Sequence, residues 1–448
     1  MSRQWISVNR REALRTNLWL MPAVLVVAGG VLFVLTYLVD RAAYNGSVSL
    51  PGWIDNGGAD AGRQILTAIA AAVIIIVGLV FSIVIVALTL ASTQFGPRML
   101  RSFIRDWGTQ VTLGVFVATF VYCVLALGSI APGSRGDFVP HLSISVSLAA
   151  IIVDSCVLIF FIHHVAKSIQ LPQVIGGIAE DLRKAIDVQI PLDRPESPDD
   201  ETEIAALTSA AGGPVLATTS GYLQHIEHAR LVRLAVSLDV VIELLYRPGH
   251  FVGRGLPWAT VWPAEAAEAV SRELERAHFT GPHRTLAQDL TFAIDQLVEI
   301  AIRALSGAVN DTFTAMTCID WLGDGLSDIS TRPAPRRVHH DDAGNVRLIE
   351  SKVSYARLVE RSFDKVRQAG RGMPAIMIRQ LESLARIMQF ARTPQRRAVL
   401  QAEADAILVS SEEAISDPGD LQDVRRRYDR VLIARDARQP MGDQEADT

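Results

Sequence analysis

The stretch that most constrains this chain is residues 65–105, in which an uncharged apolar run passes through hydroxyl-bearing residues into arginines. Residues 65–88 carry no charge, and they outnumber the roughly 20 apolar residues that a helix needs to cross a bilayer. Ser92 and Thr93 follow, and then Gly96-Pro97, a dipeptide that ends or kinks a helix. The stretch therefore predicts a transmembrane helix that leaves the membrane through a polar end.

Three further apolar runs are long enough to cross a bilayer, at residues 18–38, 110–130 and 142–163. The first could be a signal peptide, but it is longer than the usual apolar region of about 7 to 15 residues and lacks a convincing small-residue cleavage site. The sequence therefore predicts four transmembrane helices, and a lipid bilayer as the surroundings of this part.

Lysine and arginine in the short flanking segments predict the orientation of these helices. Ten such residues fall on the side of the amino terminus and three on the other side. Cytoplasmic loops carry the excess of Lys and Arg. We therefore expect an inner-membrane protein with both its amino terminus and its C-terminal domain in the cytoplasm.

The fold class expected is an all-α four-helix transmembrane domain, followed by a mainly α cytosolic domain with a small, barrel-like β insertion. Helical and strand-like apolar periods alternate along the chain, with Gly- and Pro-rich breaks between them. They predict a transmembrane domain at residues 1–170, a helix and acidic Pro-rich linker at 171–205, a small β-domain at 206–262, an α-helical domain at 263–440 and a disordered tail at 441–448.

Local signals in the cytosolic part predict several elements. The apolar run at residues 231–236 is counted with the strands of the β-domain, and a helix is expected to begin at Pro263 and run to Phe279. Residues 288–306 and 312–330 are expected to form a helical hairpin with Asp311 as the N-cap of its second helix.

Several strings together identify a family resemblance: ALTLASTQFGPRMLRSFIRD, FIHHVAKSIQLPQV, RPGHFVGRGLPWATVW and RALSGAVNDTFTAMTCIDWLGDGL. The chain resembles the bacterial predicted membrane proteins grouped as domain of unknown function 2254. The chain departs from the family's pattern at Gly307 and Thr312, where a proline often stands, so a site built on rigidity of that turn is in doubt. The resemblance implies a multi-pass membrane domain and a cytosolic domain, without an established reaction or ligand.

A second, partial resemblance covers residues 246–262, which are similar to the loop of biotinyl and lipoyl carrier domains. Those carriers attach their cofactor to a lysine, and this chain has no lysine between Lys184 and Lys352. Only the barrel-like scaffold is kept from this resemblance, and no cofactor is expected.

Asp154 is the strongest single candidate for a functional residue in the membrane domain. It lies 12 residues after Leu142, about 18 Å along a helix and close to the bilayer centre. A carboxylate at that depth needs a partner, water or a proton, so it can be part of an ion or proton site. Thr119 and Tyr122 are expected at similar depth as hydrogen-bond partners. The alternative is a neutral carboxyl group that joins two helices.

Ser82, Thr89 and Thr93 share one stripe of the second helix. Such hydroxyls can line a water-filled path, or they can bond back to their own helix carbonyls. The arginines that follow are expected to contact lipid head groups or to attract anions; they are Arg98, Arg101 and Arg105.

Two groups of polar residues in the expected cytosolic domain are candidates for a ligand site or a metal site. Asn310, Asp311 and Thr312 form a polar turn that helix capping explains, with ligand binding as the alternative. His225, Glu227 and His228 have metal-binding side chains. In a strand, however, residue 228 points away from the other two, so the three cannot converge without a further element, and no metal site is expected.

The net charge of −5 argues against nucleic-acid binding, and no nucleotide-binding or hydrolase motif is present that would predict a catalytic residue. The first functional hypothesis is a homo-oligomeric ion channel with a cytosolic gating or assembly domain. The second is a membrane-anchored sensor or scaffold whose cytosolic domain binds a partner or a small ligand. An enzyme is the third.

Overall fold

The computed structural model describes residues 19–49, 51–54, 57–95, 106–132, 137–192 and 201–437. The chain divides into two compact units, Met1–Gln173 and Val174–Thr448. We refer to them as the membrane unit and the C-terminal unit and describe each by itself.

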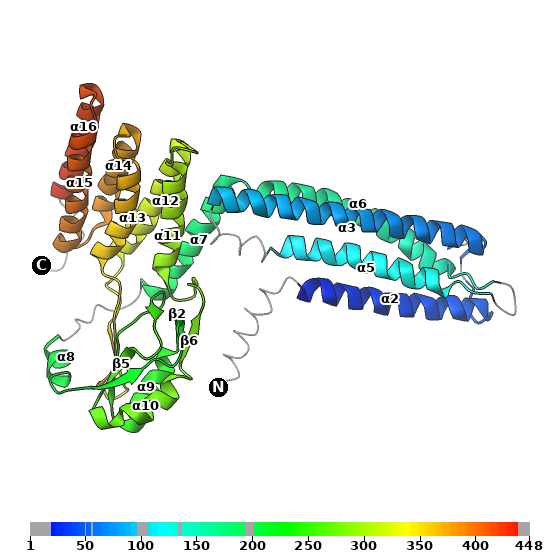
Figure 1. The fold of residues 1–448 in the computed structure, drawn as a ribbon, viewed down its shortest axis with the longest axis horizontal. Helices are drawn as coiled ribbons and strands as arrows, with labels where there is room; N and C mark the ends of the chain where they lie inside the picture. Colours follow the sequence, from blue (N-terminus) through cyan, green and yellow to red (C-terminus); the bar gives the residue numbers. More distant parts are fainter. Residues whose placement is uncertain are drawn as a thin grey trace, which may run out of the picture. The chain divides into compact units, whose positions relative to one another are not determined.

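Four long apolar helices form the membrane unit (Figure 1): α2 (Leu20–Tyr44), α3 (Ala59–Phe95), α5 (Trp107–Ser129) and α6 (His141–Ser168). Each contains a stretch long and apolar enough to cross a membrane. The short 3-10 helix η1 (Gly52–Ile54) lies between α2 and α3. The prediction of four such helices is confirmed.

The membrane unit packs one stripe of each helix inward and leaves the other apolar faces open. On α3, the buried residues Leu66, Val73 and Val80 follow a spacing of seven, which places them on one helix face. Phe116 of α5 and Phe161 of α6 belong to the same core as Val73 and Val80. Large apolar side chains on the outer faces remain exposed, as expected of helices whose solvent is lipid hydrocarbon.

The C-terminal unit is mainly helical. Its first helices are α7 (Leu171–Gln189), which begins just before the unit boundary, α8 (Glu201–Leu207), α9 (His228–Leu238) and α10 (Ala267–Leu274), with the 3-10 helix η2 (Ala264–Ala266) before α10. The remaining helices are α11 (Leu290–Ala304), α12 (Thr312–Thr331), α13 (Tyr355–Ala369), α14 (Pro374–Phe390), α15 (Pro394–Ala414) and α16 (Pro418–Asp436). Figure 1 shows α11 to α16 side by side.

Two β-sheets lie in the C-terminal unit. The five-stranded sheet has the order β1 (Gly213–Leu216), β5 (Pro257–Trp262), β3 (Val241–Leu244), β8 (Val346–Glu350) and β7 (Val338–His340). The three-stranded sheet has the order β4 (Phe251–Val252), β2 (Gly221–Ile226) and β6 (His278–Gly281). Among the strand pairs of the described residues, only β3–β8 is parallel. In the described residues these strands form no closed barrel, so the expected barrel-like insertion is corrected to two open sheets.

Two local predictions in this region are wrong. Residues 231–236 belong to helix α9, because Leu231 and Ala235 lie one turn apart and are both buried against the sheet. The expected helix from Pro263 to Phe279 ends at Leu274, and the chain then enters strand β6. This strand pairs with β2, and such long-range pairing outweighs a local helical period.

The helical hairpin was predicted correctly. Helices α11 and α12 form it, and the side chain of Asp311 accepts a hydrogen bond of 3.0 Å from the backbone N–H of Thr314. The rest of the segment expected to be α-helical, up to residue 440, contains the helices α13 to α16.

Candidate functional site

A buried glutamate organises one end of the five-stranded sheet. Glu350 is the last residue of β8, and its side chain is 2% exposed. Its Oε2 lies 3.0 Å from Nε2 of His228, and its Oε1 lies 2.6 Å from Nε2 of His339 and 2.6 Å from Nζ of Lys352. We call His228, Glu350 and His339 the His–Glu–His cluster.

Three separate elements bring this cluster together. His228 is the first residue of α9, His339 lies on β7 and Glu350 on β8. The two imidazole rings stack, with centroids 5.2 Å apart and an angle of 19° between their planes. Both Nε2 atoms therefore contact the same carboxylate, that of Glu350.

The turn between β7 and β8 sets the position of His339 relative to Glu350. Asp341 accepts hydrogen bonds from the backbone N–H groups of Ala343 and Asn345, and Gly344 adopts a φ of +87°. The Arg347 guanidinium donates to Asp341 at 2.8 Å and, with these N–H groups, lowers the pKa of Asp341 to about 2. The DDAGN segment thus forms the hairpin that its turn residues predict.

The three donors determine the charge of Glu350. Burial raises the pKa of a carboxyl group, but here the hydrogen bonds from His228 and His339 and the charge of Lys352 outweigh burial. The pKa of Glu350 therefore lies well below its ordinary value, and the carboxylate is ionised at neutral pH.

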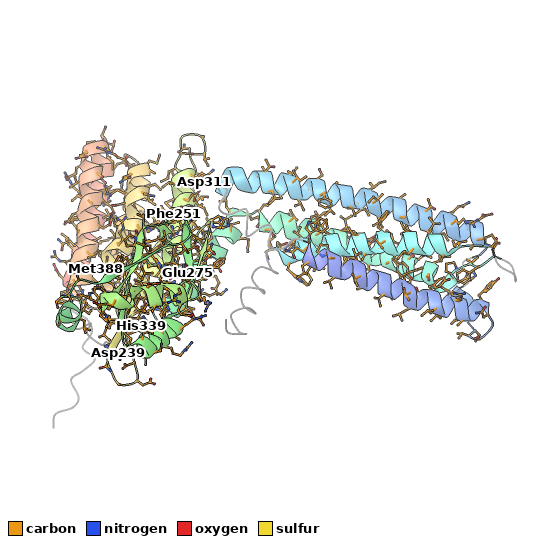
Figure 2. All side chains as sticks on the ribbon, turned by 60° about the horizontal axis from the view of Figure 1, so that its bottom comes forward. Asp239, Phe251, Glu275, Asp311, His339 and Met388 are labelled. Atoms are coloured by element: carbon orange, nitrogen blue, oxygen red, sulfur yellow. The ribbon has the colours of Figure 1, made fainter. Side chains whose placement is uncertain are left out.

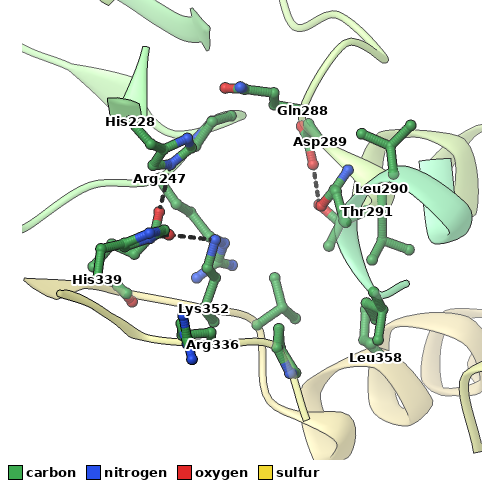
Figure 3. A pocket seen from close by; sticks show the side chains of 18 residues that line it. His228, Arg247, Gln288, Asp289, Leu290, Thr291, Arg336, His339, Lys352 and Leu358 are labelled. Carbon is green, nitrogen blue, oxygen red and sulfur yellow. Dashed lines mark hydrogen bonds and ion pairs between the residues drawn. The ribbon is translucent and has the colours of Figure 1, made fainter. Parts of the chain in front are cut away.

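The cluster lines a cavity of about 210 Å³ (Figure 3). His228, Arg247, His339, Lys352 and Arg336 lie on one side of it in this view. The opposite side is formed by Gln288, Asp289, Leu290, Thr291 and Leu358. Val188 and Gln189 at the C-terminal end of α7, and Ile190 directly after it, also line the cavity.

Two guanidinium groups at this cavity lack an acceptor. Arg247 and Arg336 are partly buried, and within the described residues neither side chain makes a hydrogen bond or an ion pair. Burial lowers the pKa of Arg247; Asp289 raises it, while Arg361 and Arg284 lower it further. The cavity wall therefore holds cationic groups that its own carboxylates do not neutralise.

Asp289 already takes part in a neighbouring network of hydrogen bonds and ion pairs. Nε of Arg284 donates to its Oδ2 at 2.7 Å, and the Thr291 hydroxyl donates to its Oδ1 at 2.7 Å. Arg284 also pairs with Asp295, which Arg361 holds from the other side. Burial raises the pKa of Asp295, but these guanidinium groups outweigh burial and lower it.

The loop that carries Arg247 is fixed by its backbone. The Gly249 N–H donates to the Leu223 carbonyl, and the Leu223 N–H donates to the His250 carbonyl, both at 2.8 Å. Gly249 has a φ of +94°, and a Cβ at this position would overlap the Asp289 carboxylate. Glycine is thus required both by the backbone conformation and by the close approach of Asp289.

The polar turn predicted as a low-ranked ligand site lies elsewhere. Figure 2 shows Asp311 well apart from His339 within the C-terminal unit. Asn310 has a φ of +52°, Asp311 caps α12, and Thr312 is the first residue of that helix. None of these three residues lines the described cavity.

The trio of His225, Glu227 and His228 does not converge. Only His228 belongs to the cluster, and its partners come from β7 and β8. No local pattern in the sequence indicates His339 and Glu350 as partners of His228, because they follow it more than 100 residues later in the chain.

In the membrane unit, Asp154 is fully buried. The Thr119 hydroxyl donates to its Oδ1 at 3.2 Å, whereas its Oδ2 has no hydrogen-bond partner in the described part of the chain. Tyr122 contacts a different group, with its hydroxyl 2.8 Å from that of Thr36.

The hydroxyl stripe of α3 is exposed in its described part. Ser82 and Thr89 are both on the surface of the single chain, and the Thr89 hydroxyl donates to the Ile85 carbonyl at 2.9 Å. The backbone of Thr93 belongs to α3, but its side chain lies outside the described structure. The three arginines expected at the membrane surface also lie outside it: Arg98, Arg101 and Arg105.

A second buried acid in the membrane unit was missed by the sequence analysis. Asp40 of α2 accepts hydrogen bonds from the backbone N–H groups of Leu142 (2.8 Å) and Ser143 (3.0 Å) and from the Ser143 hydroxyl (2.7 Å). These N–H groups belong to the first turn of α6, so Asp40 caps that helix from a neighbouring one. In the sequence, the only sign of this role is an aspartate directly after an apolar run, a pattern that is also typical of the start of a loop.

Comparisons with known proteins agree with the membrane assignment. A family model described as a predicted membrane protein (DUF2254) matches residues 15–386. Two uncharacterized proteins, Mb1321c of Mycobacterium bovis and Rv1290c of Mycobacterium tuberculosis, are each 30% identical over 432 residues, which cover 92% of this chain and 80% of theirs. No solved structure matches.

Proposed function

The chain belongs to the DUF2254 family of predicted membrane proteins, and on this premise we propose that it is a membrane-anchored sensor whose C-terminal unit binds a small anion. One observation carries the proposal. The partly buried Arg247 guanidinium faces the cavity, and no described residue offers it a hydrogen-bond acceptor or an ion-pair partner.

A guanidinium group removed from water loses solvation unless an acceptor replaces it. Its planar fork binds carboxylate or phosphate oxygens through two parallel hydrogen bonds. Arg336 adds a further cation to the same lining, while Glu350 is paired with Lys352 and Asp289 with Arg284. A ligand that carries negative charge fits this charge distribution.

The size of the cavity limits the ligand. Pockets for drug-sized molecules measure about 300 to 1,000 Å³, and this cavity measures about 210 Å³. It suits a small phosphorylated or carboxylated molecule. The leucines at positions 290 and 358 line the cavity as well and offer apolar contact to its carbon skeleton.

Chain connectivity supports a role in sensing. Helix α6, the fourth apolar span, ends at Ser168, and α7 begins at Leu171. The other end of α7 forms part of the cavity lining. One continuous helix thus separates the ligand cavity from a membrane helix along the chain, and a ligand that shifts the end of α7 can act on that membrane helix.

The test is binding of inorganic phosphate to the full-length protein in detergent, measured by isothermal titration calorimetry. We expect Arg247→Gln to weaken binding at least tenfold. The matched control is Arg254→Gln, an exposed arginine on the next loop, after β4, which should leave the affinity unchanged. Equal affinities for wild type and Arg247→Gln would reject the proposal, and a series of small dicarboxylates tests the alternative ligand class.

A second candidate function is an ion pathway through the membrane unit. It is favoured by Asp154, which is buried near the middle of α6 with one carboxylate oxygen lacking a hydrogen-bond partner in the described residues. Buried acids in membrane helices commonly serve ion or proton transfer. A pathway would need several subunits, because a single chain supplies few helices. The outward-facing Ser82 and Thr89 are then candidates for its lining, with Thr93 on the same stripe.

Liposome reconstitution tests this second function. The expected result is a proton or cation flux that Asp154→Asn abolishes, with an oligomer present in detergent. Absence of flux from wild-type protein would reject it, and the sensor proposal would be unaffected. The same liposomes, with a protease-sensitive tag at either terminus, test whether both termini share the side that the Lys and Arg distribution predicts to be cytoplasmic.

A further inference from the structure

Three side chains with metal-binding atoms converge in the C-terminal unit without any motif in the sequence. The Nε2 atoms of His228 and His339 and a carboxylate oxygen of Glu350 all lie within 4.8 Å of one another. They come from a helix start and two strands, so the fold itself gathers them.

We propose that the His–Glu–His cluster binds a divalent transition-metal ion of the Zn²⁺ class. Two imidazoles and one carboxylate are a ligand set that zinc accepts in proteins, and imidazole also suits Fe, Ni and Cu. The two imidazole rings stack, and their Nε2 atoms contact the two oxygens of the same Glu350 carboxylate, so the three ligand groups already lie side by side.

All three residues line the cavity described above. A metal held by three protein ligands keeps a further coordination position open, and here that position would face the cavity. This step rests on the proposed function: an anion bound in the cavity would contact both the open coordination position of the metal and the Arg247 guanidinium. The metal site itself does not depend on that function.

Lys352 is the competing cation. Its Nζ contacts Glu350 at 2.6 Å, and its side chain is 30% exposed, so it can leave toward solvent when a metal takes its place. Metal binding also requires Nε2 of each histidine to be free of its proton. A neutral imidazole meets this requirement by carrying its proton on Nδ1, and an imidazolium does so by releasing one proton to solvent.

This competition gives a prediction that a purely structural cluster does not make. Removing the charge in Lys352→Met should strengthen metal binding at least fivefold. In contrast, His228→Gln and His339→Gln keep a hydrogen-bond donor near Glu350 but remove a metal ligand, and each should weaken binding at least tenfold. His340→Ala, the exposed neighbour on β7, is the matched control and should leave binding unchanged.

The experiment uses full-length protein purified in detergent through a tag without histidine and treated with a chelator. Zn²⁺ affinity is measured by competition with a chromophoric chelator, and circular dichroism checks that each variant is folded. X-ray absorption at the zinc edge of the loaded wild-type protein should give nitrogen and oxygen neighbours at about 2.0 to 2.2 Å, with an imidazole signature.

Two outcomes would overturn the proposal. One is wild-type affinity no higher than that of the two glutamine variants. The other, which remains decisive if those variants fail to fold, is an absorption spectrum without imidazole ligands. Phosphate titrations with and without Zn²⁺ separate the two proposals, because loss of metal binding alone leaves phosphate affinity in the metal-free protein intact.

Discussion

Replacing Glu403 with glutamine is expected to stabilise the C-terminal unit at alkaline pH and to have little effect at acidic pH. Glu403 lies on α15 and is 8% exposed. Its Oε1 is 3.6 Å from Nε of Arg367, too far for a hydrogen bond. Burial raises the pKa of Glu403 to about 7, the charge of Asp364 adds to this rise, and Arg367 opposes it.

The direction of this pH dependence follows from the linkage between proton binding and folding. A carboxyl group with a raised pKa in the folded state contributes fully to stability below its unfolded pKa of 4.5. It loses that contribution as the pH rises through about 7. A tenfold change in a proton-binding constant corresponds to about 1.4 kcal/mol, so the loss amounts to at most roughly 3 to 4 kcal/mol. Glutamine has nearly the same shape and does not ionise, so it avoids this loss.

The assay is urea unfolding of the full-length protein in detergent, followed by circular dichroism at several pH values between about 4 and 8.5, a range that spans the two pKa values. The difference in unfolding free energy between Glu403→Gln and wild type should grow with pH. Glu413→Gln removes an exposed charge on the same helix and should give a small difference with little pH dependence. A difference for Glu403→Gln that stays flat over this range would refute the reasoning.

Three further substitutions test other parts of the structure. Asp40→Ala should lower the thermal midpoint of the detergent-solubilised protein by removing the cap of α6, at a cost of about 1 to 2 kcal/mol, whereas the exposed Asp60→Ala should not. Gly249→Ala should displace the Asp289 carboxylate and cost at least about 1 kcal/mol; calorimetry should then find weaker phosphate binding, and unchanged binding would contradict the assigned cavity wall. Asp311→Ala should cost about 1 kcal/mol in urea unfolding through loss of the α12 cap, without changing phosphate affinity.

Features governed by local sequence were predictable. The apolar spans follow from length and composition, and the cap at Asp311 follows from one residue beside a helical period. Helix α9 and strand β6 could not be predicted from the sequence. Their apolar residues fit both a helical and a strand period, and tertiary packing determines which of the two forms. In the same way, the α2 boundary was predicted too early, because Asp40 is charged yet finds its partners on another helix.

The candidate site was less predictable than the fold. Arg247 and its glycine-rich loop stood out as a turn-rich segment, but nothing local to that loop indicates a cavity. His339 and Glu350 became partners of His228 only through the pairing of β8 with both β3 and β7. Such a convergence depends on sheet order, which a single sequence does not specify.

The parallel pairing of β3 with β8 has a consequence for how the protein is made. Ile242 of β3 pairs with Leu348 of β8, which follows it only after the rest of the sheet region, so the central sheet stays incomplete until the ribosome has translated past the β7–β8 hairpin. Until then β3 exposes an unpaired edge toward the place that β8 will take, and exposed strand edges recruit other chains. By that stage all four apolar helices have been synthesised, so membrane insertion can precede closure of the sheet. A nascent chain arrested before residue 346 should therefore be anchored by its helices and yet depend on chaperones that shield strand edges.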